Sequence, residues 1–560
     1  MTKVPFTMSH ADARARSKRA GRATADAGGG ARLFQVPKEA PTARPRKLAE
    51  VIAYAIKRDI AARGWPVGEV LGNQDELMQR YGVSRSTLRE AIRQVERHGI
   101  AHMRRGAHGG LVVQSPARDS VVLAVASYLE LAGVSLGELF DAREVVEGLM
   151  VGLICERATD NELTRLHDHL EALLSSPEDD LEQDVVLELK LRSAIAELSR
   201  NGALQLLLEA LYRVTSDMLT VAPGHPHTRA LVRESRREKR ELVDALVAGD
   251  EISARVAVRD ALERSRQQAR KLLKTRRTDF GQASALTLGA RSMAVDPTGV
   301  LPKLGHRLSL RIANDIVEAG LEKGDRVGAE PELCERYDVS RAVFREAVRI
   351  LEVHDIVQVR RGLGGGLTVG RPDPAYTVEL TSLYFQYARL KPRHFYELWR
   401  AIQVAAVQFA ARRMNDSGRA ELIAVVERQK SAGSDEMLTM HGELHSALSR
   451  LSGNHVIELF TSVMAEIAAH YPTEVPPAGV WQAFVKSHAE LVQAVSDGGV
   501  ALARRLMLRH LQLVDAWYGD SSRREWLAAL ADADDPSTVV HPPESPARRR
   551  KGRAPSGQST

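Results

Sequence analysis

An internal repeat limits what this chain can fold into more than any other feature of its sequence. The segment from Gly82 to Arg97, GVSRSTLREAIRQVER, returns 256 positions later, from Asp338 to Val353, as DVSRAVFREAVRILEV. Between positions 82 and 113, about half of the residues are identical to those 256 positions further on. Similarity at one fixed spacing indicates an internal duplication rather than chance, so we expect two copies of one folding unit.

The repeated segment has the periodicity of an amphipathic helix. Its apolar stripe consists of Leu88, Ala91, Ile92 and Val95, and its basic stripe consists of Arg85, Arg89 and Arg93. Ser84 is a candidate N-cap, which would place the positive end of the helix dipole beside Arg85. The matching residues of the second copy are Ser340, Arg341, Arg345 and Arg349. We expect the basic face to meet phosphates and base edges; a merely solvated face is the alternative.

Further short elements surround the basic helix in each copy. In the first copy an amphipathic helix precedes a short helix over residues 75–81, and a turn at Gly82 leads into the basic helix. Residues 99–113 follow as two short strands around a glycine-rich turn. The second copy repeats the short helix over residues 332–337 and the strands over residues 356–369. Each copy is therefore expected to be a helix-turn-helix followed by a β-hairpin wing.

Helical periodicity continues for roughly 150 residues after each winged unit. In the first half, helices are expected over residues 121–131, 136–157, 160–174, 181–198, 203–214, 228–248 and 251–273. The expected fold is mainly α, with two winged helix-turn-helix domains, each followed by an antiparallel all-α bundle. The expected domains are a disordered basic tail (1–45), a first winged domain (46–116) and bundle (117–275), a linker (276–304), a second winged domain (305–372) and bundle (373–530, with an extra helix up to Leu530), and a second basic tail (531–560).

Composition narrows the class of protein. The chain has 44% hydrophobic and 27% charged residues, and no apolar run is long enough to span a bilayer. Its two cysteines, Cys155 and Cys334, form no CxxC pair, which favours a reducing compartment. We therefore expect a cytoplasmic protein. The net charge of +6 is small for 560 residues, so the clustered arginines are better evidence for nucleic acid than the total charge.

The repeated unit resembles the GntR family of bacterial transcription regulators. Both copies contain V-S-R-x-x-x-R-E-A-x-R, with Ile or Val before the last Arg, and a wing R-R-G-x-x-G-G-L. The resemblance implies that the DNA-contacting residues are Ser84, Arg85, Thr87, Arg89, Arg93, Arg105 and Gly106 in the first copy and Ser340, Arg341, Arg345, Arg349, Arg361 and Gly362 in the second. One departure is that Asp75 and Pro331 stand where many members carry a further DNA-contacting arginine.

Two winged units in one chain suggest a pair of DNA-reading heads. Such domains usually bind as dimers, with recognition helices in major grooves about one helical turn apart. One chain holding both heads would be a pseudo-dimer, although a homodimer with four heads stays open. The copies differ at Ser86 and Thr87 against Ala342 and Val343, so we expect an imperfect palindrome as the operator.

The bundles resemble the FCD domain, the ligand-sensing domain of the FadR subfamily. The second bundle carries the signature LHSALSRLSGN over residues 444–454. The resemblance places four metal ligands at His441, His445, His488 and His510. His441 replaces the usual Asp, and an all-imidazole set favours Zn or Ni over Mn. Histidines satisfied in an ordinary core are the alternative.

The first bundle lacks this histidine set. Its matching positions hold Glu188, Arg192, Lys239 and Ala261. Because cations do not bind a metal, we expect a divalent metal in the second bundle only. Our hypothesis is that Arg192 and Lys239, near Arg143, offer positive charge to a carboxylate ligand instead. A decayed pocket, kept only as a dimerisation scaffold, is the other interpretation.

These observations together predict a ligand-responsive, sequence-specific DNA-binding regulator, most simply a repressor of metabolic genes. In the second bundle, Arg400 stands where the family often has a pocket arginine, so a small organic acid could bridge Arg400 and the metal. Two alternatives stay open: a metal-dependent enzyme of helical-bundle type, and an architectural DNA binder without a ligand. The sequence shows no P-loop, no nucleotide-binding glycine motif after a strand and no accompanying general base, which disfavours the enzyme.

Overall fold

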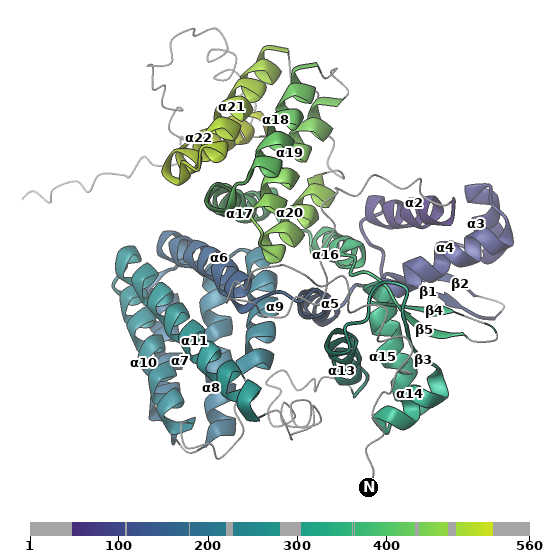
Figure 1. Ribbon diagram of the computed structural model, residues 1–560, viewed down its shortest axis with the longest axis horizontal. Helices are drawn as coiled ribbons and strands as arrows, with labels where there is room; N and C mark the ends of the chain where they lie inside the picture. The colour runs from purple at the N-terminus through teal and green to yellow at the C-terminus, as the bar shows by residue number, and fades with distance from the viewer. Residues whose placement is uncertain are drawn as a thin grey trace, which may run out of the picture.

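The computed structural model describes residues 48–106, 109–178, 180–219, 228–279, 304–360, 362, 365–431, 436–468 and 478–518. The expected basic tails, residues 280–303 of the expected linker and the extra helix up to Leu530 lie outside these residues. Within them the chain is mainly helical, and each half contains a winged helix-turn-helix domain followed by a helical bundle (Figure 1). The expected fold class is confirmed.

The first winged domain, the first head, contains three helices and a two-stranded wing. Its elements are α2 (Leu48–Ala62), α3 (Gln74–Tyr81), α4 (Arg85–Arg97), β1 (Ala101–Arg104) and β2 (Gly110–Val113). Asn73 caps α3, and its capping box is completed by Glu76. Gly82 has a φ of 63°, a left-handed conformation that glycine adopts easily, and it turns the chain into α4. The wing is antiparallel and pairs Ala101 with Val113.

The second winged domain, the second head, has one strand more. Its elements are α13 (Leu304–Glu318), β3 (Arg326–Gly328), α14 (Glu330–Tyr337), α15 (Arg341–Val353), β4 (Val357–Arg360) and β5 (Gly366–Val369). Strand β5 lies between β3 and β4, and both pairings are antiparallel. The sequence did not indicate β3, whose counterpart in the first head is the single bridge between Val70 and Val112.

Among the described residues, seven helices follow the head in each half. The first half has α5 (Arg118–Leu131), α6 (Leu136–Arg157), α7 (Asp160–Ser175), α8 (Leu181–Leu198), α9 (Gly202–Leu219), α10 (Thr228–Val247) and α11 (Glu251–Asp279). The second half has α16 (Ala375–Tyr387), α17 (Pro392–Arg413), α18 (Asp416–Ser431), α19 (Met437–Leu451), α20 (His455–Ala468), α21 (Ala478–Ser496) and α22 (Val500–Tyr518). Helix α11 continues beyond its expected end and takes up the first residues of the expected linker.

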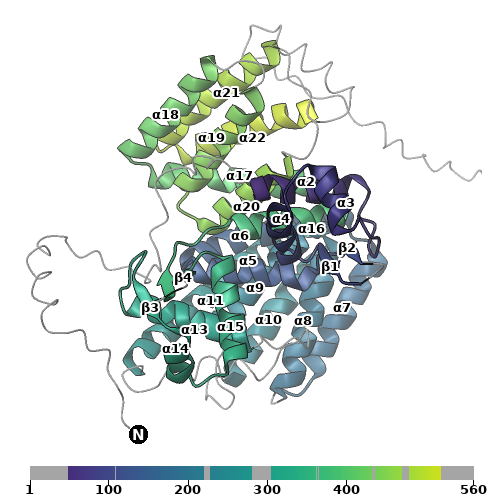
Figure 2. The same cartoon turned by 90° about the vertical axis from the view of Figure 1, so that its right-hand side faces the viewer.

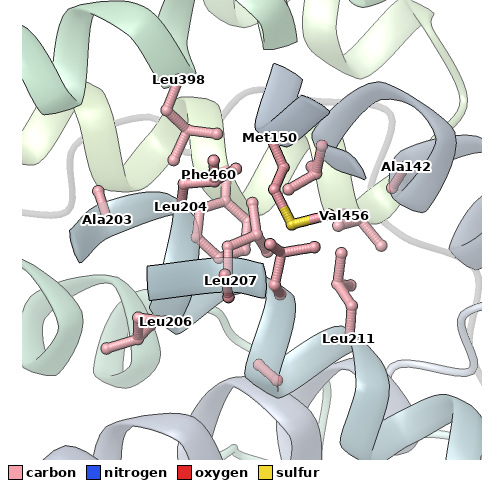
Figure 3. Packing of buried hydrophobic residues seen from close by; sticks show 14 of the residues in the cluster. Ala142, Met150, Ala203, Leu204, Leu206, Leu207, Leu211, Leu398, Val456 and Phe460 are labelled. Atoms are coloured by element: carbon pink, nitrogen blue, oxygen red, sulfur yellow. The ribbon is translucent and has the colours of Figure 1, made fainter. Parts of the chain in front are cut away.

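The two bundles share one hydrophobic core. Phe460 of α20 is fully buried and packs with Leu204 and Leu207 of α9 and Met150 of α6 (Figure 3). Apolar side chains that are removed from water contribute about 25 cal/mol per Å². The halves are therefore held together by the same kind of packing that holds each bundle.

Polar contacts across this core obey an approximate twofold symmetry. The buried Asn201 amide donates a hydrogen bond to the carbonyl oxygen of His394 in the other half at 2.9 Å. Asn454 donates in the same way to the carbonyl oxygen of Glu138 at 2.8 Å. Because each asparagine makes the other's contact in the opposite direction, the halves pair as the two subunits of a dimer would. One chain therefore contains its own pseudo-dimer.

Each head packs against the first bundle helix of the opposite half. Leu383 of α16 lies in the core of the first head, and Leu131 of α5 lies in the core of the second. Lys57 of the first head forms an ion pair with Glu379 of α16. This crossed docking places both heads on the same side of the molecule, with α4 and α15 toward the viewer in Figure 2.

Replacing Phe460 by Ala should destabilise the whole chain by about 3–5 kcal/mol, because it opens a cavity in the core that both halves share. The measurement is the free energy of unfolding from a guanidinium titration. Leu502→Ala is the control, since Leu502 is 41% exposed on α22. Equal, small losses for both variants would contradict a shared core.

Candidate DNA interface and metal centre

The recognition helices are built as the sequence predicts. Oγ of Ser84 accepts a hydrogen bond from the backbone N–H of Thr87 at 3.3 Å, and Oγ of Ser340 accepts one from that of Val343 at the same distance. The predicted apolar stripe of α4 is buried: Leu88, Ala91, Ile92 and Val95. Burial of one face fixes the rotation of each helix and leaves the basic face outward.

The predicted DNA-contacting arginines of the recognition helices and of the first wing are exposed. They are Arg85, Arg89, Arg93 and Arg105 in the first head and Arg341, Arg345 and Arg349 in the second. Gly106 and Gly362 also lie at exposed wing positions, with φ angles of 112° and 110° that favour glycine. Thr87 is half-buried and its hydroxyl lies 3.0 Å from that of Ser84. Arg361 lies outside the described residues.

Four histidines come together inside the second bundle. One ring nitrogen from each of His441, His445, His488 and His510 lies within 4.8 Å of the others. His441 and His445 stand one turn apart on α19, while α21 and α22 supply the other two. The histidines that the resemblance implied as ligands are thus neighbours in space.

Side-chain amides orient two of these rings. Nδ1 of His445 lies 2.9 Å from Oε1 of Gln403, and Nδ1 of His488 lies 2.7 Å from Oε1 of Gln429. Amide oxygens only accept, so each Nδ1 carries the proton and donates it, leaving the lone pair on Nε2. Outer partners of this kind fix the tautomer of metal-binding histidines. No sequence pattern indicated this role for Gln403 or Gln429.

The inner nitrogens fit a divalent cation. His441 Nδ1 and His488 Nε2 are buried without a hydrogen-bond partner. Nε2 of His445 lies 3.3 Å from Nε2 of His510, which is about the edge of a tetrahedron built from Zn–N bonds of roughly 2.0–2.1 Å. A cation between these atoms would satisfy groups that are otherwise costly to bury.

Burial keeps the four rings neutral. It lowers the pKa of His441 to about 4. For His445, His488 and His510, burial and the neighbouring histidines hold the pKa well below its ordinary value. Neutral imidazole is the form that binds metal. Because none of the four is a carboxylate, a bound divalent ion would keep its full charge of +2 for a further anionic ligand.

The predicted effector residue Arg400 lies on α17. Its side chain is exposed. The neighbouring Trp399 lies beside the histidines, with its ring centroid 4.9 Å from that of His445. Trp399 stands one turn before Gln403 on α17. The role of Arg400 toward an effector stays a prediction.

The first bundle holds an ion-pair network at the matching place. Nε of Arg192 donates to Oε1 of Glu188 at 2.9 Å, and Nζ of Lys239 lies 3.5 Å from the same oxygen. Nε of Arg143 donates to Oε1 of Glu147 at 2.7 Å. The predicted cations are thus close together, but two carboxylates already pair with them.

The pKa values of Glu188 and Lys239 show that the charges of this network interact strongly. Burial alone would raise the pKa of Glu188, yet Arg192 and Lys239 more than offset it and hold that pKa at about 2. Burial and Arg192 lower the pKa of Lys239. The guanidinium carbons of Arg143 and Arg192 each lie 4.9 Å from the centre of the Tyr212 ring. Three cations against two carboxylates leave one excess positive charge.

Buried histidines line the contacts between heads and bundles. Burial and Lys57 lower the pKa of His98 to about 4, although Glu379, 3.4 Å away, opposes this. Burial likewise lowers the pKa values of His306 and His354 to about 4. All three are therefore neutral when the heads are docked at pH 7.

The unfolding free energy should fall as the pH drops from about 6.5 toward 4. In that window the unfolded histidine, with a pKa of 6.5, takes up a proton that the folded one does not. In the His98→Gln variant one proton fewer is taken up on unfolding. The slope of the unfolding free energy against pH should therefore fall by about 1.4 kcal/mol per pH unit. Urea titrations between pH 7.5 and 5 measure it. His169→Gln, at an exposed position, should keep the original slope; an unchanged slope for His98→Gln would contradict the prediction.

The described helices include none long and apolar enough to cross a membrane. The GntR family of bacterial regulatory proteins matches residues 48–109 and 304–366, and the FCD domain matches residues 138–264 and 394–513. Each family match thus occurs twice, and each head match precedes a bundle match.

Individual relatives resemble parts of the chain. The Uxu operon regulator of Haemophilus influenzae is 29% identical over 172 residues, which cover 30% of this chain and 61% of that protein. The transcriptional repressor NanR of Cronobacter sakazakii is 27% identical over 165 residues, 29% of this chain and 62% of that protein. The chain thus spans less than two thirds of either relative. The structure of Streptococcus agalactiae GntR is 22% identical, covers 40% of this chain and 99% of that one, and has a TM-score of 0.31.

Both domain types, each present in two copies and in the same order, account for most of the described residues. The chain therefore belongs to the GntR family of bacterial transcription regulators, in the FadR-like subfamily, and is a DNA-binding regulator, not an enzyme, with two helix-turn-helix units and two FCD domains in tandem.

Proposed function

We propose that the chain is a repressor whose two heads read unlike half-sites of one operator. The observation that supports this most directly is the placement of α4 and α15 on the same side of a molecule held by one core (Figure 2). Recognition helices that enter neighbouring major grooves must face one duplex together. The relatives described as an operon regulator and a repressor support the direction of control, and the proposed place of action is the cytoplasm.

The half-sites are expected to differ because the heads differ. Thr87 and Val343 occupy the same position at the start of the two recognition helices. A hydroxyl can exchange hydrogen bonds with a base edge, whereas valine can only make apolar contacts. An imperfect palindrome therefore fits the chain better than a symmetric one.

The second bundle is the proposed sensor, with a divalent metal at the four histidines. Zn or Ni suits four imidazoles, and the metal would act as a Lewis acid toward an anionic ligand. Gln403 and Gln429 hold the rings in the binding tautomer, while Trp399 forms an apolar wall. A small organic acid is the effector that matches an uncompensated +2 charge.

The first bundle is proposed to take an anion without a metal. Arg143, Arg192 and Lys239 outnumber Glu147 and Glu188 by one charge, so a monocarboxylate would neutralise the network. Its ligand would meet guanidinium and ammonium groups in place of the imidazole-bound metal.

A contiguous route joins the histidine centre to the first head. Gln403, which orients His445, also donates a hydrogen bond to Oγ1 of Thr461 on α20 at 3.0 Å. Helix α20 packs on α16, whose Leu383 is buried in the first head. A ligand that shifts α20 would thus change how that head is held, provided that it binds the two arrangements with different free energies.

The decisive experiment maps genomic fragments bound by the full chain, footprints one operator and then adds the metal and a panel of organic acids. Protection of two unlike half-sites, changed by one acid, supports the proposal. Protection of a single half-site would overturn the hypothesis that both heads bind one operator. Binding that no metabolite or metal changes would favour an architectural DNA binder.

A further inference from the structure

A carboxylate holds one arginine of each recognition helix. In the first head, Oδ1 of Asp75 lies 3.5 Å from Nη2 of Arg85. In the second head, Oε1 of Glu330 accepts a hydrogen bond from Nε of Arg345 at 3.0 Å. Both acids lie in the first turn of the preceding helix, α3 or α14.

The two heads achieve this pairing from positions that do not correspond. Glu330 aligns with Gln74 and Pro331 aligns with Asp75, so the acid moves by one residue between copies. The held arginine moves by four residues, because Arg345 corresponds to Arg89 and not to Arg85. One turn of helix therefore separates the held arginine of the first head from that of the second.

A carboxylate that binds one edge of a guanidinium sets the orientation of the guanidinium plane and of its remaining N–H donors. Arginine recognises guanine through two parallel N–H donors, and fixing the plane beforehand removes entropy that would otherwise be lost on binding. In the second head the acid uses Nε of Arg345, so the edge formed by the two Nη atoms stays available. Both held arginines are accessible to a ligand, since the side chains of Arg85 and Arg345 are 65% and 69% exposed.

We propose that Asp75 and Glu330 are positioning residues that set base specificity, by orienting Arg85 in the first head and Arg345 in the second for bidentate contact with a base pair. This rests on the proposed function, in which the heads read the two half-sites of one operator. Arg89 and Arg341, the corresponding arginines that neither acid contacts, then serve mainly as phosphate contacts. The half-sites differ in which base pair is read most strictly.

The test compares Asp75→Asn and Glu330→Gln in the full chain, against the footprinted operator and single-base-pair variants of each half-site. Glu330→Gln should lose roughly 5-fold or more of the discrimination at one base pair of the second half-site and leave the first unchanged. Asp75→Asn should do the reverse. Glu335→Gln and Glu69→Gln are matched controls, since both remove one exposed acid from a head and neither acid pairs with an arginine among the described ion pairs.

The controls separate positioning from bulk charge. Loss of any acid should tighten binding to random DNA, because one repulsion of the phosphates disappears. Only the two positioning acids should also change base preference. If Glu330→Gln and Glu335→Gln gave the same base profile, the inference would be overturned while the two-headed function stood. If the wild-type chain preferred no half-site at all, both would be overturned.

Discussion

Replacing Arg85 and Arg345 together by Ala should remove most of the chain's preference for its operator. Each bidentate base contact is worth about 1–3 kcal/mol, and the two residues lie in different heads, so their losses should add. The expected fall in operator affinity is roughly 30-fold to 20,000-fold. Fluorescence anisotropy at one fixed salt concentration measures it, with random DNA of the same length as reference.

Two comparisons make this result specific. Arg89→Ala with Arg341→Ala should weaken operator and random DNA alike and reduce the salt dependence, which is the behaviour of phosphate contacts. Arg259→Ala removes one exposed charge from α11, remote from the heads, and should leave DNA binding unchanged. Retention of the full operator preference by the Arg85 and Arg345 double variant would show that the bases are read by other residues.

Replacing His445 and His488 together by Ala should abolish metal binding and remove its contribution to stability. Elemental analysis of the purified wild-type chain should give one divalent metal per chain, and the variant should give none. A ligand present at 1,000 times its dissociation constant stabilises a folded protein by about 4 kcal/mol. A chelator should therefore lower the melting temperature of the wild type and have little effect on the variant.

His169→Ala is the matched control, because His169 is exposed on α7 and lies outside the histidine centre. It should retain the metal and the response to chelator. Two metal equivalents per wild-type chain would contradict a site confined to the second bundle. A full equivalent in the double variant would show that the four histidines are not the ligands.

Local sequence patterns predict most elements of this fold because their causes are local. Helix α6 runs from Leu136 to Arg157 as expected, since Ser135 and Glu138 form a capping box at its start. Strand β3 was not predicted because its three residues are too few to show an alternation of polar and apolar side chains. The apolar stripes of the recognition helices were equally readable, because burial of Leu88 and Val95 follows from helical spacing alone.

Features that depend on tertiary packing could not be read in the same way. The alignment did not single out Trp399, whose ring lies beside that of His445 although the two residues are on different helices. The crossed docking of the heads rests on pairs such as Lys57 and Glu379, which are far apart in sequence and share no pattern. The cations of the first bundle were recognisable in the sequence, but the pairing of Arg143 with Glu147 depends on the fold.

Fusion of the two halves around one core also changes what dilution and mutation can do. A dimer of separate subunits dissociates when its concentration falls, whereas a covalent pair keeps its heads together even at a few copies per cell. In a homodimer every substitution also appears twice, once on each side of the axis. Here a substitution at the position of His441 or Glu188 affects only one half. One bundle can therefore keep a metal site while the other evolves a different kind of binding site.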